Sequence, residues 1–364
     1  MLISASVGAG HDGVAAELAR RLGAMGVEVD RHDFLDLMPR RSGTALRAIY
    51  RWQLELAPRS WGWLLAAGQR KGVGGRMTAM TAMADAATLH AIGAGAAAVV
   101  STYPLASQVL GRLGRTGQLK VPTLTYLTDM SVHPIWVADG VDIHLAIHDE
   151  AAAQAKALGA TDVRVIEPAV PAGFAVGARA ADLVAARDRW GLPRERPLAL
   201  VVAGAWGVGD IERTSRDIAA TGLAVPVVVC GRNDALRQRL RRTGVAIALD
   251  WVDDMAALVR TCQVMVQNAG GLSSLEGIVA GIPVVTYRCI PGHGRSNAEA
   301  LDRAGLVPWI RTPADLRAGL RQALAPDTRA SGLAALRPEQ VVADLIAARR
   351  ARGTERALKP VAAP

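Results

Sequence analysis

The chain alternates short apolar runs with longer segments of helical periodicity, and this alternation starts twice. In the first half, the predicted strands lie at 2–4, 27–33, 99–101, 121–127 and 144–147. In the second half, they lie at 198–203, 225–230, 245–249, 264–266 and 283–287. Continuous apolar strands joined by helical crossovers form parallel sheets that helices cover on both faces. The pattern therefore predicts two such sheets.

A stretch without periodicity separates the two halves. Residues 169–177 gather Pro171, Gly173 and Gly177, which is the composition of a linker. We therefore predict three parts: an N-terminal domain at 1–168, a C-terminal domain at 177–330, and a C-terminal helix with a basic tail at 331–364. The expected fold class is α/β, with two Rossmann-like domains whose parallel sheets face each other across a cleft.

The bulk composition is that of a globular protein of about two domains. Of the 364 residues, 51% are hydrophobic and 21% are charged. Cys230, Cys262 and Cys289 lie singly in or beside apolar runs, which indicates buried thiols in a reducing compartment. Neither a leader pattern nor an apolar run of about 20 residues is visible, so we expect a cytoplasmic protein without a membrane span. Since the first predicted strand is unusually short, an alternative is that the natural chain begins upstream of Met1.

Positive charge is unevenly distributed along the chain, with one cluster in the first half and a second near the C-terminal end. The formal charge is +9, and residues 40–76 carry eight Arg or Lys side chains against Glu55 alone. Such a cluster indicates an anionic partner, and the alternative is a solvated arginine-rich surface. Within the cluster, one helical face is apolar and consists of Leu46, Ile49, Tyr50 and Leu54. Arg47 and Arg51 lie beside this face, and Trp61 and Trp63 follow it. This pattern is typical of a helix in a membrane interface, so we expect peripheral binding to the anionic inner face of the cell membrane and no binding to nucleic acid.

The first predicted strand leads directly into a glycine turn and a helix. Gly8, Gly10 and Gly13 form a G-x-G-x-x-G pattern, and with Asp30 or Asp33 further on this leaves a dinucleotide site open. His11 at the helix start favours a different function, because an imidazole there can remove a proton from a substrate.

A second group follows the strand predicted at 121–127. Asp129 and His133 lie on a loop at the carboxyl end of that strand, where parallel sheets place ligands. A carboxylate beside an imidazole suits acid–base chemistry or the orientation of a hydroxyl group. The proton acceptor is therefore either His11 or Asp129, and Asp129 alternatively orients His11.

The strand ends of the second half carry groups that suit a nucleotide. Gly204 and Gly207 follow its first strand. The ends of the next three strands carry Arg232 and Asn233; Trp251 and Val252; and Asn268, Gly270, Gly271, Leu272, Ser273 and Glu276. An aromatic ring suits a base, a carboxylate suits ribose hydroxyls, and amides at a helix start suit a diphosphate. No Asp-x-Asp pair occurs in the chain, so we expect no metal ion and no cofactor beyond a nucleotide-sugar substrate.

Four segments together resemble a known family. They are the run from Ser6 to His11, the Thr128-Asp129…His133-Pro134…Trp136 stretch, the run from Val229 to Asn233, and the run from Asn268 through Pro291-Gly292. The sequence is similar to the monogalactosyldiacylglycerol synthase and processive diacylglycerol glucosyltransferase family. More distantly, it resembles the peptidoglycan N-acetylglucosaminyltransferase that acts on a lipid-linked muropeptide.

The resemblance implies a GT-B fold of the family 28 type, with a UDP-sugar in the C-terminal domain and the acceptor in the N-terminal one. It implies an inverting hexosyltransferase that acts on diacylglycerol or a polyprenyl-linked sugar. The acceptor would contact the N-terminal domain at Thr102, Pro104, His133 and Trp136. The donor would also contact Gly292 and His293, and Gly8 and Gly10 would face its diphosphate from the N-terminal domain. Family members usually have Gln-Glu after the Pro-Gly pair, and because His293-Gly294 stand here, the donor sugar stays open.

Other functions stay open on the residues alone. They are a UDP-sugar 2-epimerase on the same fold, a natural-product glycosyltransferase that does not bind membranes, a dinucleotide-dependent oxidoreductase, and a non-catalytic binding module.

Overall fold

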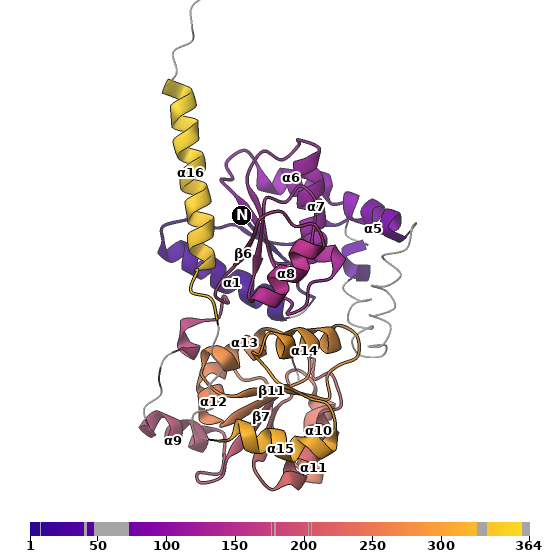
Figure 1. Cartoon of the computed structure of the whole chain (residues 1–364), viewed down its shortest axis with the longest axis vertical. Helices are drawn as coiled ribbons and strands as arrows, with labels where there is room; N and C mark the ends of the chain where they lie inside the picture. The colour runs from indigo at the N-terminus through magenta and orange to yellow at the C-terminus, as the bar shows by residue number, and fades with distance from the viewer. Residues whose placement is uncertain are drawn as a thin grey trace, which may run out of the picture.

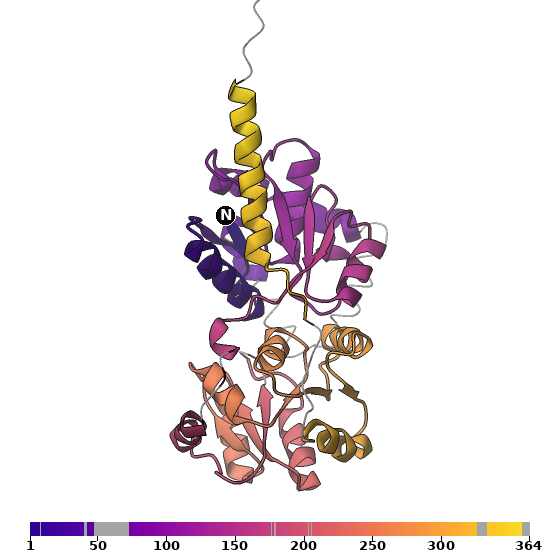
Figure 2. The same cartoon turned by 60° about the vertical axis from the view of Figure 1, so that its left-hand side comes forward.

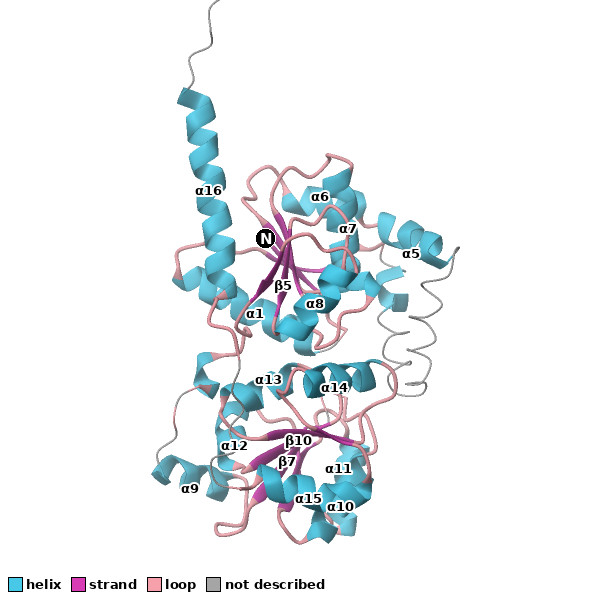
Figure 3. Ribbon diagram, viewed as in Figure 1, coloured by secondary structure: helices cyan, strands magenta, loops and turns pink. Residues whose placement is uncertain are grey.

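The structure is a computed structural model that describes residues 1–7, 9–39, 42–46, 73–175, 177, 180–202, 204, 206–325 and 333–358. Two lobes lie one above the other, each built around its own sheet (Figure 1). Helices lie on both faces of each sheet, as Figure 3 shows by secondary structure. The α/β architecture with two parallel sheets is the predicted one.

The N-terminal lobe contains a six-stranded parallel sheet in the order β2-β1-β3-β4-β5-β6. Its strands are β1 (Leu2–Ser4), β2 (Arg31–Asp33), β3 (Val99–Ser101), β4 (Thr123–Tyr126), β5 (Ile143–Ala146) and β6 (Val163–Val165). Its helical segments are α1 (Ala9–Ala24), α2 (Phe34–Leu37), α5 (Val73–Ala82), α6 (Asp85–Ile92), α7 (Pro104–Arg115), η1 (Pro134–Trp136) and α8 (Asp149–Ala157).

The C-terminal lobe contains a second six-stranded parallel sheet, in the order β12-β11-β10-β7-β8-β9. Its strands are β7 (Leu198–Val202), β8 (Val225–Val229), β9 (Ile247–Leu249), β10 (Val264–Gln267), β11 (Val284–Tyr287) and β12 (Trp309–Ile310). Its helical segments are η2 (Ala172–Phe174), α9 (Ala180–Arg189), α10 (Ile211–Thr221), α11 (Asp234–Thr243), α12 (Met255–Thr261), α13 (Leu272–Val279), α14 (His293–Arg303) and α15 (Pro313–Ala323).

The last helix, α16 (Pro338–Leu358), returns to the N-terminal lobe and runs along its side, as the turned view shows (Figure 2). Arg21 of α1 contacts both chain segments that cross between the lobes. Its guanidinium bonds to Glu17, Glu167 and Glu339, at 2.8, 2.6 and 3.4 Å, and to the carbonyl oxygen of Val170 at 2.7 Å. The two chain segments that pass between the lobes are therefore fixed to one side chain.

The predicted strands differ from the observed ones mainly at the sheet edges. The run at 27–33 pairs only at Arg31–Asp33, because its partner β1 has three residues. Val27 and Val29 instead pack against the core as partly buried side chains. The edge strands β6 and β12 were not predicted, since one is partly exposed along its whole length and the other has two residues.

Much of the basic, tryptophan-containing segment lies outside the described residues. This applies to Ile49, Tyr50, Leu54, Arg47, Arg51, Trp61 and Trp63. Leu46 is described, and it packs against the core of the N-terminal lobe. Across the part of the chain that the structure describes, no helix combines the length and apolar character needed to span a bilayer.

Candidate active site

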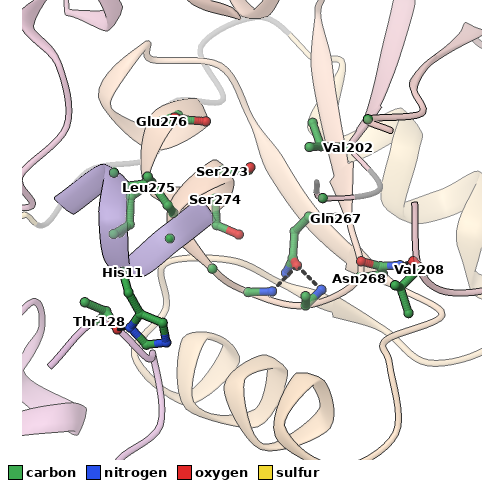
Figure 4. Close-up of a pocket in the computed structure, with 18 of the residues that line it drawn as sticks. His11, Thr128, Val202, Val208, Gln267, Asn268, Ser273, Ser274, Leu275 and Glu276 are labelled. Atoms are coloured by element: carbon green, nitrogen blue, oxygen red, sulfur yellow. Dashed lines mark hydrogen bonds between the residues drawn. The ribbon is translucent and has the colours of Figure 1, made fainter. Parts of the chain in front are cut away.

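A cavity of about 460 Å³ lies between the lobes, at the carboxyl ends of strands from both sheets. The N-terminal lobe contributes His11, Thr128 and Asp129 among other residues, and the C-terminal lobe contributes the segment from Gln267 to Glu276. Figure 4 shows His11 and Thr128 near the start of α13. Parallel α/β sheets bind ligands at this edge, so the cavity is the candidate active site.

His11 lies in the first turn of α1, with its ring held in one orientation. Its Nδ1 atom lies 2.7 Å from the Thr102 carbonyl oxygen and 2.9 Å from Thr128 Oγ1. Because a carbonyl oxygen can only accept, Nδ1 carries the hydrogen and Nε2 keeps its lone pair. Burial lowers the pKa of His11 and outweighs the opposing charge of Asp129. The ring is thus poised to accept a proton at Nε2.

The direct contacts of Asp129 are with Trp136 and His133, not with His11. Its Oδ2 accepts a hydrogen bond from Trp136 Nε1 at 2.8 Å and lies 3.6 Å from His133 Nε2. Burial alone raises the pKa of this carboxyl group, but hydrogen bonding and charge from His133 outweigh it and hold the pKa below its usual range. Such a carboxylate is a weak base. The hydrogen bonds that orient the His11 ring come from Thr102 and Thr128. The alternative prediction, in which Asp129 orients His11 by direct contact, is therefore wrong.

Two of the four predicted acceptor contacts are buried. Thr102 and Trp136 each have 0% of their surface exposed. Thr102 also donates from Oγ1 to the backbone carbonyl of His11, at 3.1 Å. These two residues support the site from behind, and their prediction as acceptor contacts is corrected. Pro104, the first residue of α7, and His133 are partly exposed.

The glycine turn between β10 and α13 is held from inside by a glutamine. Gln267 Oε1 accepts hydrogen bonds from the amides of Ala269, at 2.8 Å, and Gly270 (Figure 4). The amide of Gly270 is therefore occupied, which corrects its predicted contact with a diphosphate. The amides of Leu272 and Ser273 are in the first turn of α13, where the helix offers no acceptor.

Ser274 and Gln267 also line the cavity. The sequence placed Ser274 at the helix start that suits a diphosphate but did not single out Gln267. Ser274 Oγ is buried and has no hydrogen-bond partner among the described residues. A buried hydroxyl without a partner is costly, so a ligand acceptor in the cavity would satisfy it. The position of Gln267 at the end of an apolar strand was the available signal for that residue.

Glu276 lines the cavity from the second turn of α13. Burial raises the pKa of its carboxyl group to about 7, against the opposing effect of a hydrogen bond with Ser273. The carboxylate is thus poorly solvated when the cavity holds no ligand. Hydroxyl donors from a ribose would compensate for that loss of water.

Arg232 lies against two tryptophans that line the cavity. Its guanidinium carbon lies 5.9 Å from the centre of the Trp206 ring and 5.3 Å from that of Trp251. Trp251 is 49% exposed, and both tryptophans line the cavity with Val252 and Gly204. The prediction placed Trp251 and Val252 here but did not single out Trp206, which lies within the glycine-rich loop.

Three predicted donor contacts have supporting roles: Gly207, Asn233 and Gly292. These three residues and Arg232 are absent from the described cavity lining. Asn233 caps α11 through Leu236 N at 2.9 Å, and its Nδ2 donates to the carbonyl oxygens of Trp206 and Gly207. A Cβ atom on Gly207 would lie 2.6 Å from Asn233 Cβ. Gly292, at φ 84°, precedes α14 and directs the chain into that helix. Asn268 lines the cavity and donates to Val208 O at 2.9 Å.

His293 enters the cavity from the C-terminal lobe, at the first position of α14. Burial lowers its pKa, although the charge of Asp129 acts in the opposite direction. The charges of His133, His11 and His293 all lower the pKa of the Asp129 carboxyl group, and His293 belongs to the other lobe. The sequence placed each group near the cavity, but only the fold brings the three rings to one carboxylate.

One glycine of the N-terminal fingerprint, Gly13, allows close packing between the lobes. Gly8 lies outside the described residues, and Gly10 lines the cavity. A Cβ atom on Gly13 would lie 2.7 Å from Leu272 Cδ2, so this glycine allows α1 to approach α13. Asp33 caps α2 through the amide of Leu35, at 2.9 Å. These contacts give Gly13 and Asp33 structural roles that do not require a bound dinucleotide.

Comparison with solved structures defines the class of fold. MurG from Acinetobacter baumannii superposes with a TM-score of 0.60 and 16% identity, over 96% of this chain and 99% of that chain. Os79 from O. sativa, solved in complex with UDP, gives a TM-score of 0.57 and 13% identity, over 90% and 91%. The glycosyltransferase SnogD from Streptomyces nogalater gives 0.55 and 16%, over 95% and 99%. The chain has the GT-B fold.

Sequence comparison narrows the class to a family. Residues 11–171 match the family model for monogalactosyldiacylglycerol (MGDG) synthase. A processive diacylglycerol beta-glucosyltransferase of Bacillus cytotoxicus is 27% identical over 230 residues, or 60% of this chain and 57% of the relative. A protein of the same name from Bacillus cereus is 25% identical over 238 residues, or 64% and 60%. The N-terminal part of the chain is therefore similar to the MGDG synthase family, and the chain spans about three-fifths of the length of these relatives.

Proposed function

We propose that the protein is a glycosyltransferase that moves a hexose from a UDP-sugar to a hydroxyl group of a lipid acceptor. The observation that carries this proposal is the pairing of two features across one cavity. His11 of the N-terminal lobe offers an unprotonated Nε2, and α13 of the C-terminal lobe offers free amides at its start. The first suits proton removal from a hydroxyl, and the second suits a departing diphosphate.

The proposed reaction is a single displacement with inversion at the anomeric carbon. The acceptor oxygen forms a bond to that carbon as its proton passes to His11 Nε2, and the bond from the carbon to the diphosphate oxygen breaks. UDP leaves with the bonding electron pair. The low-pKa carboxylate of Asp129 stabilises the imidazolium that His11 becomes.

The donor is proposed to bind along the C-terminal side of the cavity. Its base lies near Trp251 and Val252, its ribose hydroxyls donate to Glu276, and its diphosphate accepts from the amides of Gly271, Leu272 and Ser273. The hydroxyl of Ser274 and the guanidinium of Arg232 complete the diphosphate site. These groups provide the compensating charge without a metal ion, so turnover should persist in excess EDTA. Loss of turnover that Mg²⁺ restores would contradict this part of the proposal.

The acceptor is proposed to be diacylglycerol or a polyprenyl-linked sugar, taken up at the inner face of the cell membrane. The names of the Bacillus relatives, processive diacylglycerol beta-glucosyltransferases, support a diacylglycerol acceptor. The MurG and UDP-bound neighbours support the GT-B scaffold, and the basic segment at 40–76 supports contact with an anionic surface.

The test is UDP release measured over a panel of UDP-hexoses, with diacylglycerol, a polyprenyl-linked sugar, a soluble phenol, or no acceptor. We expect release that depends on a lipid acceptor. Sugar turnover without acceptor would instead indicate an epimerase, and release with the phenol alone would indicate a natural-product glycosyltransferase.

A further inference from the structure

Asn297 of α14 connects the two lobes through one buried amide group. Its side-chain Oδ1 accepts hydrogen bonds from Ser131 N at 2.9 Å and Ser131 Oγ at 2.8 Å. Its Nδ2 donates to the carbonyl oxygen of Ala269 at 3.0 Å. The residue is 1% exposed although it lies at the boundary between the lobes.

Its partners determine the orientation of this amide. A backbone N–H can only donate, so the atom facing Ser131 N must be the oxygen. A carbonyl can only accept, so the atom facing Ala269 must be the nitrogen. A flipped amide would lose these hydrogen bonds, and no other common side chain of this size offers an acceptor on one side and a donor on the other.

Each end of the contact holds a segment of the candidate active site. Ser131 lies between Asp129 and His133, on the loop that follows β4 of the N-terminal lobe. Ala269 begins the glycine turn that leads into α13 of the C-terminal lobe. A Cβ atom on Gly270 would lie 2.8 Å from Asn297 Cβ, so the turn packs directly on this residue.

We propose that Asn297 and Ser131 form an interlobe latch, which holds the loop carrying Asp129 and His133 in register with the glycine turn. In this role Asn297 is a positioning residue. The closed arrangement of the lobes depends on it, and proton transfer and diphosphate departure would take place only when the latch is formed. The catalytic part of the inference rests on the proposed function, whereas the closure of the lobes does not.

A second set of contacts also supports the loop that carries Asp129 and His133. Gln154 Oε1 accepts from Val132 N at 2.8 Å, and Gln154 Nε2 donates to Glu150 at 2.8 Å. Glu150 lies 3.3 Å from Arg303 Nε at the end of α14. Because the Arg303 side chain is 61% exposed, this ion pair contributes little by itself. The latch is therefore tested at Asn297 and Ser131.

The test measures lobe closure on the full chain by small-angle X-ray scattering, without ligand and with UDP. Asn297→Ala removes every bond of the latch, and Ser131→Ala removes one of the two on the N-terminal side and keeps the backbone amide. Ser107→Ala is the control, because its buried hydroxyl bonds only within the N-terminal lobe, to Ser101 and Thr125 among others. We expect a larger radius of gyration for Asn297→Ala, a smaller increase for Ser131→Ala, and none for Ser107→Ala.

A kinetic measurement with UDP-glucose and diacylglycerol vesicles completes the test. We expect Asn297→Ala to lower kcat about tenfold or more while the Kd for UDP changes less than threefold, since displaced catalytic groups reduce the rate more than binding. Scattering identical to wild type in folded Asn297→Ala and Ser131→Ala would overturn the latch. Should wild type show no turnover, the proposed function fails, and the scattering result still decides the latch. If the lobes open but kcat is unchanged, the positioning role is overturned.

Discussion

At the scale of single residues, the site depends on two groups whose protonation the fold has set. His11 is held with its hydrogen on Nδ1 by the Thr102 carbonyl, and burial lowers its pKa. Glu276 is affected in the opposite sense, since burial raises its pKa to about 7. With His11 as the proposed base and Glu276 as the proposed ribose contact, the activity and the nucleotide affinity are expected to depend on pH separately.

Replacing His11 tests the base directly. We expect His11→Gln to lower kcat by about 10²–10⁴-fold, the usual contribution of a general base, with the Kd for UDP within about threefold of wild type. The measurement is UDP release beside calorimetric titration with UDP. Near-normal turnover in the variant would return the role of base to Asp129.

Replacing Glu276 tests the ribose contact through pH. The ionised carboxylate accepts hydrogen bonds and the protonated one is a weaker acceptor, so UDP affinity should fall as pH decreases through about 7. Between pH 8 and pH 6 the ionised fraction of a carboxyl group with a pKa of about 7 falls about tenfold, so we expect the Kd to rise by up to about tenfold. Glu276→Gln serves as control and should show only the pH dependence of UDP itself. An identical pH profile in both proteins would remove Glu276 from the site.

The raised pKa of Glu276 also predicts how the stability of the protein without ligand depends on pH. The pKa of Glu276 is higher in the folded state than its ordinary value, so its stabilising effect is complete below about pH 4.5 and is lost as pH rises through about 7. Glu276→Gln should therefore raise the melting temperature relative to wild type at pH 8, with little difference at pH 4.5. An equal shift at both pH values would contradict the burial of this carboxylate.

At the scale of elements, the start of α13 depends on the shape of the turn before it. Gly270 has φ 69°, in the left-handed region that favours glycine, and it packs on Asn297. Gln267 holds the turn from inside through two amides. The helix start is thus placed by contacts on both sides, and its free amides are those of the following residues.

Substitutions at two glycines that flank α13 allow the cost of backbone strain to be measured separately from the cost of crowding. Gly270 and Gly281 both have positive φ, at 69° and 72°, but a Cβ atom on Gly281 meets nothing within 4 Å. We expect Gly281→Ala to destabilise the protein by about 1 kcal/mol through φ alone and to leave UDP binding unchanged. Gly270→Ala should cost more and weaken UDP binding at least threefold, because the turn must move away from Asn297. Denaturant titration and calorimetry measure both, and equal effects at the two positions would contradict a specific role for the turn.

At the scale of the whole molecule, the two lobes share a cavity, a latch and a crossing held by Arg21. The C-terminal helix α16 rests on the N-terminal lobe although it follows the C-terminal lobe in sequence (Figure 2). The basic segment belongs to the N-terminal half of the chain, which also contributes His11.

Neutralising the basic segment tests membrane association. The quadruple variant with Arg47, Arg51, Arg59 and Arg70 changed to Gln should be released from anionic vesicles at low salt, since each basic group near such a surface contributes up to about 1 kcal/mol. UDP affinity should be unaffected. Neutral vesicles and the variant with Arg194, Arg213, Arg216 and Arg242 changed to Gln are the controls for charge alone. Wild-type protein that does not sediment with anionic vesicles would favour a soluble acceptor.

The sequence by itself determined the elements with strong local signals. Apolar runs separated by helical patterns predicted both parallel sheets, and the residues at the strand ends located His11, Asp129, Trp251 and the turn before α13. These predictions succeeded because periodicity, glycine turns and strand ends are properties of neighbouring residues. They failed at the edge strands β6 and β12, because β6 is partly exposed along its whole length and β12 has only two residues, so neither has a strong local pattern.

Only the tertiary structure decided which of those residues face the cavity and which support it. Trp136 and Thr102 are buried behind Asp129 and His11, and Gln267 occupies the Gly270 amide. The meeting of Ser131 with Asn297, 166 positions apart, joins two lobes that have separate sequence patterns. Hydrogen-bond partners, burial and pKa depend on atoms that are near in space and far in sequence, and a one-dimensional pattern does not contain that proximity.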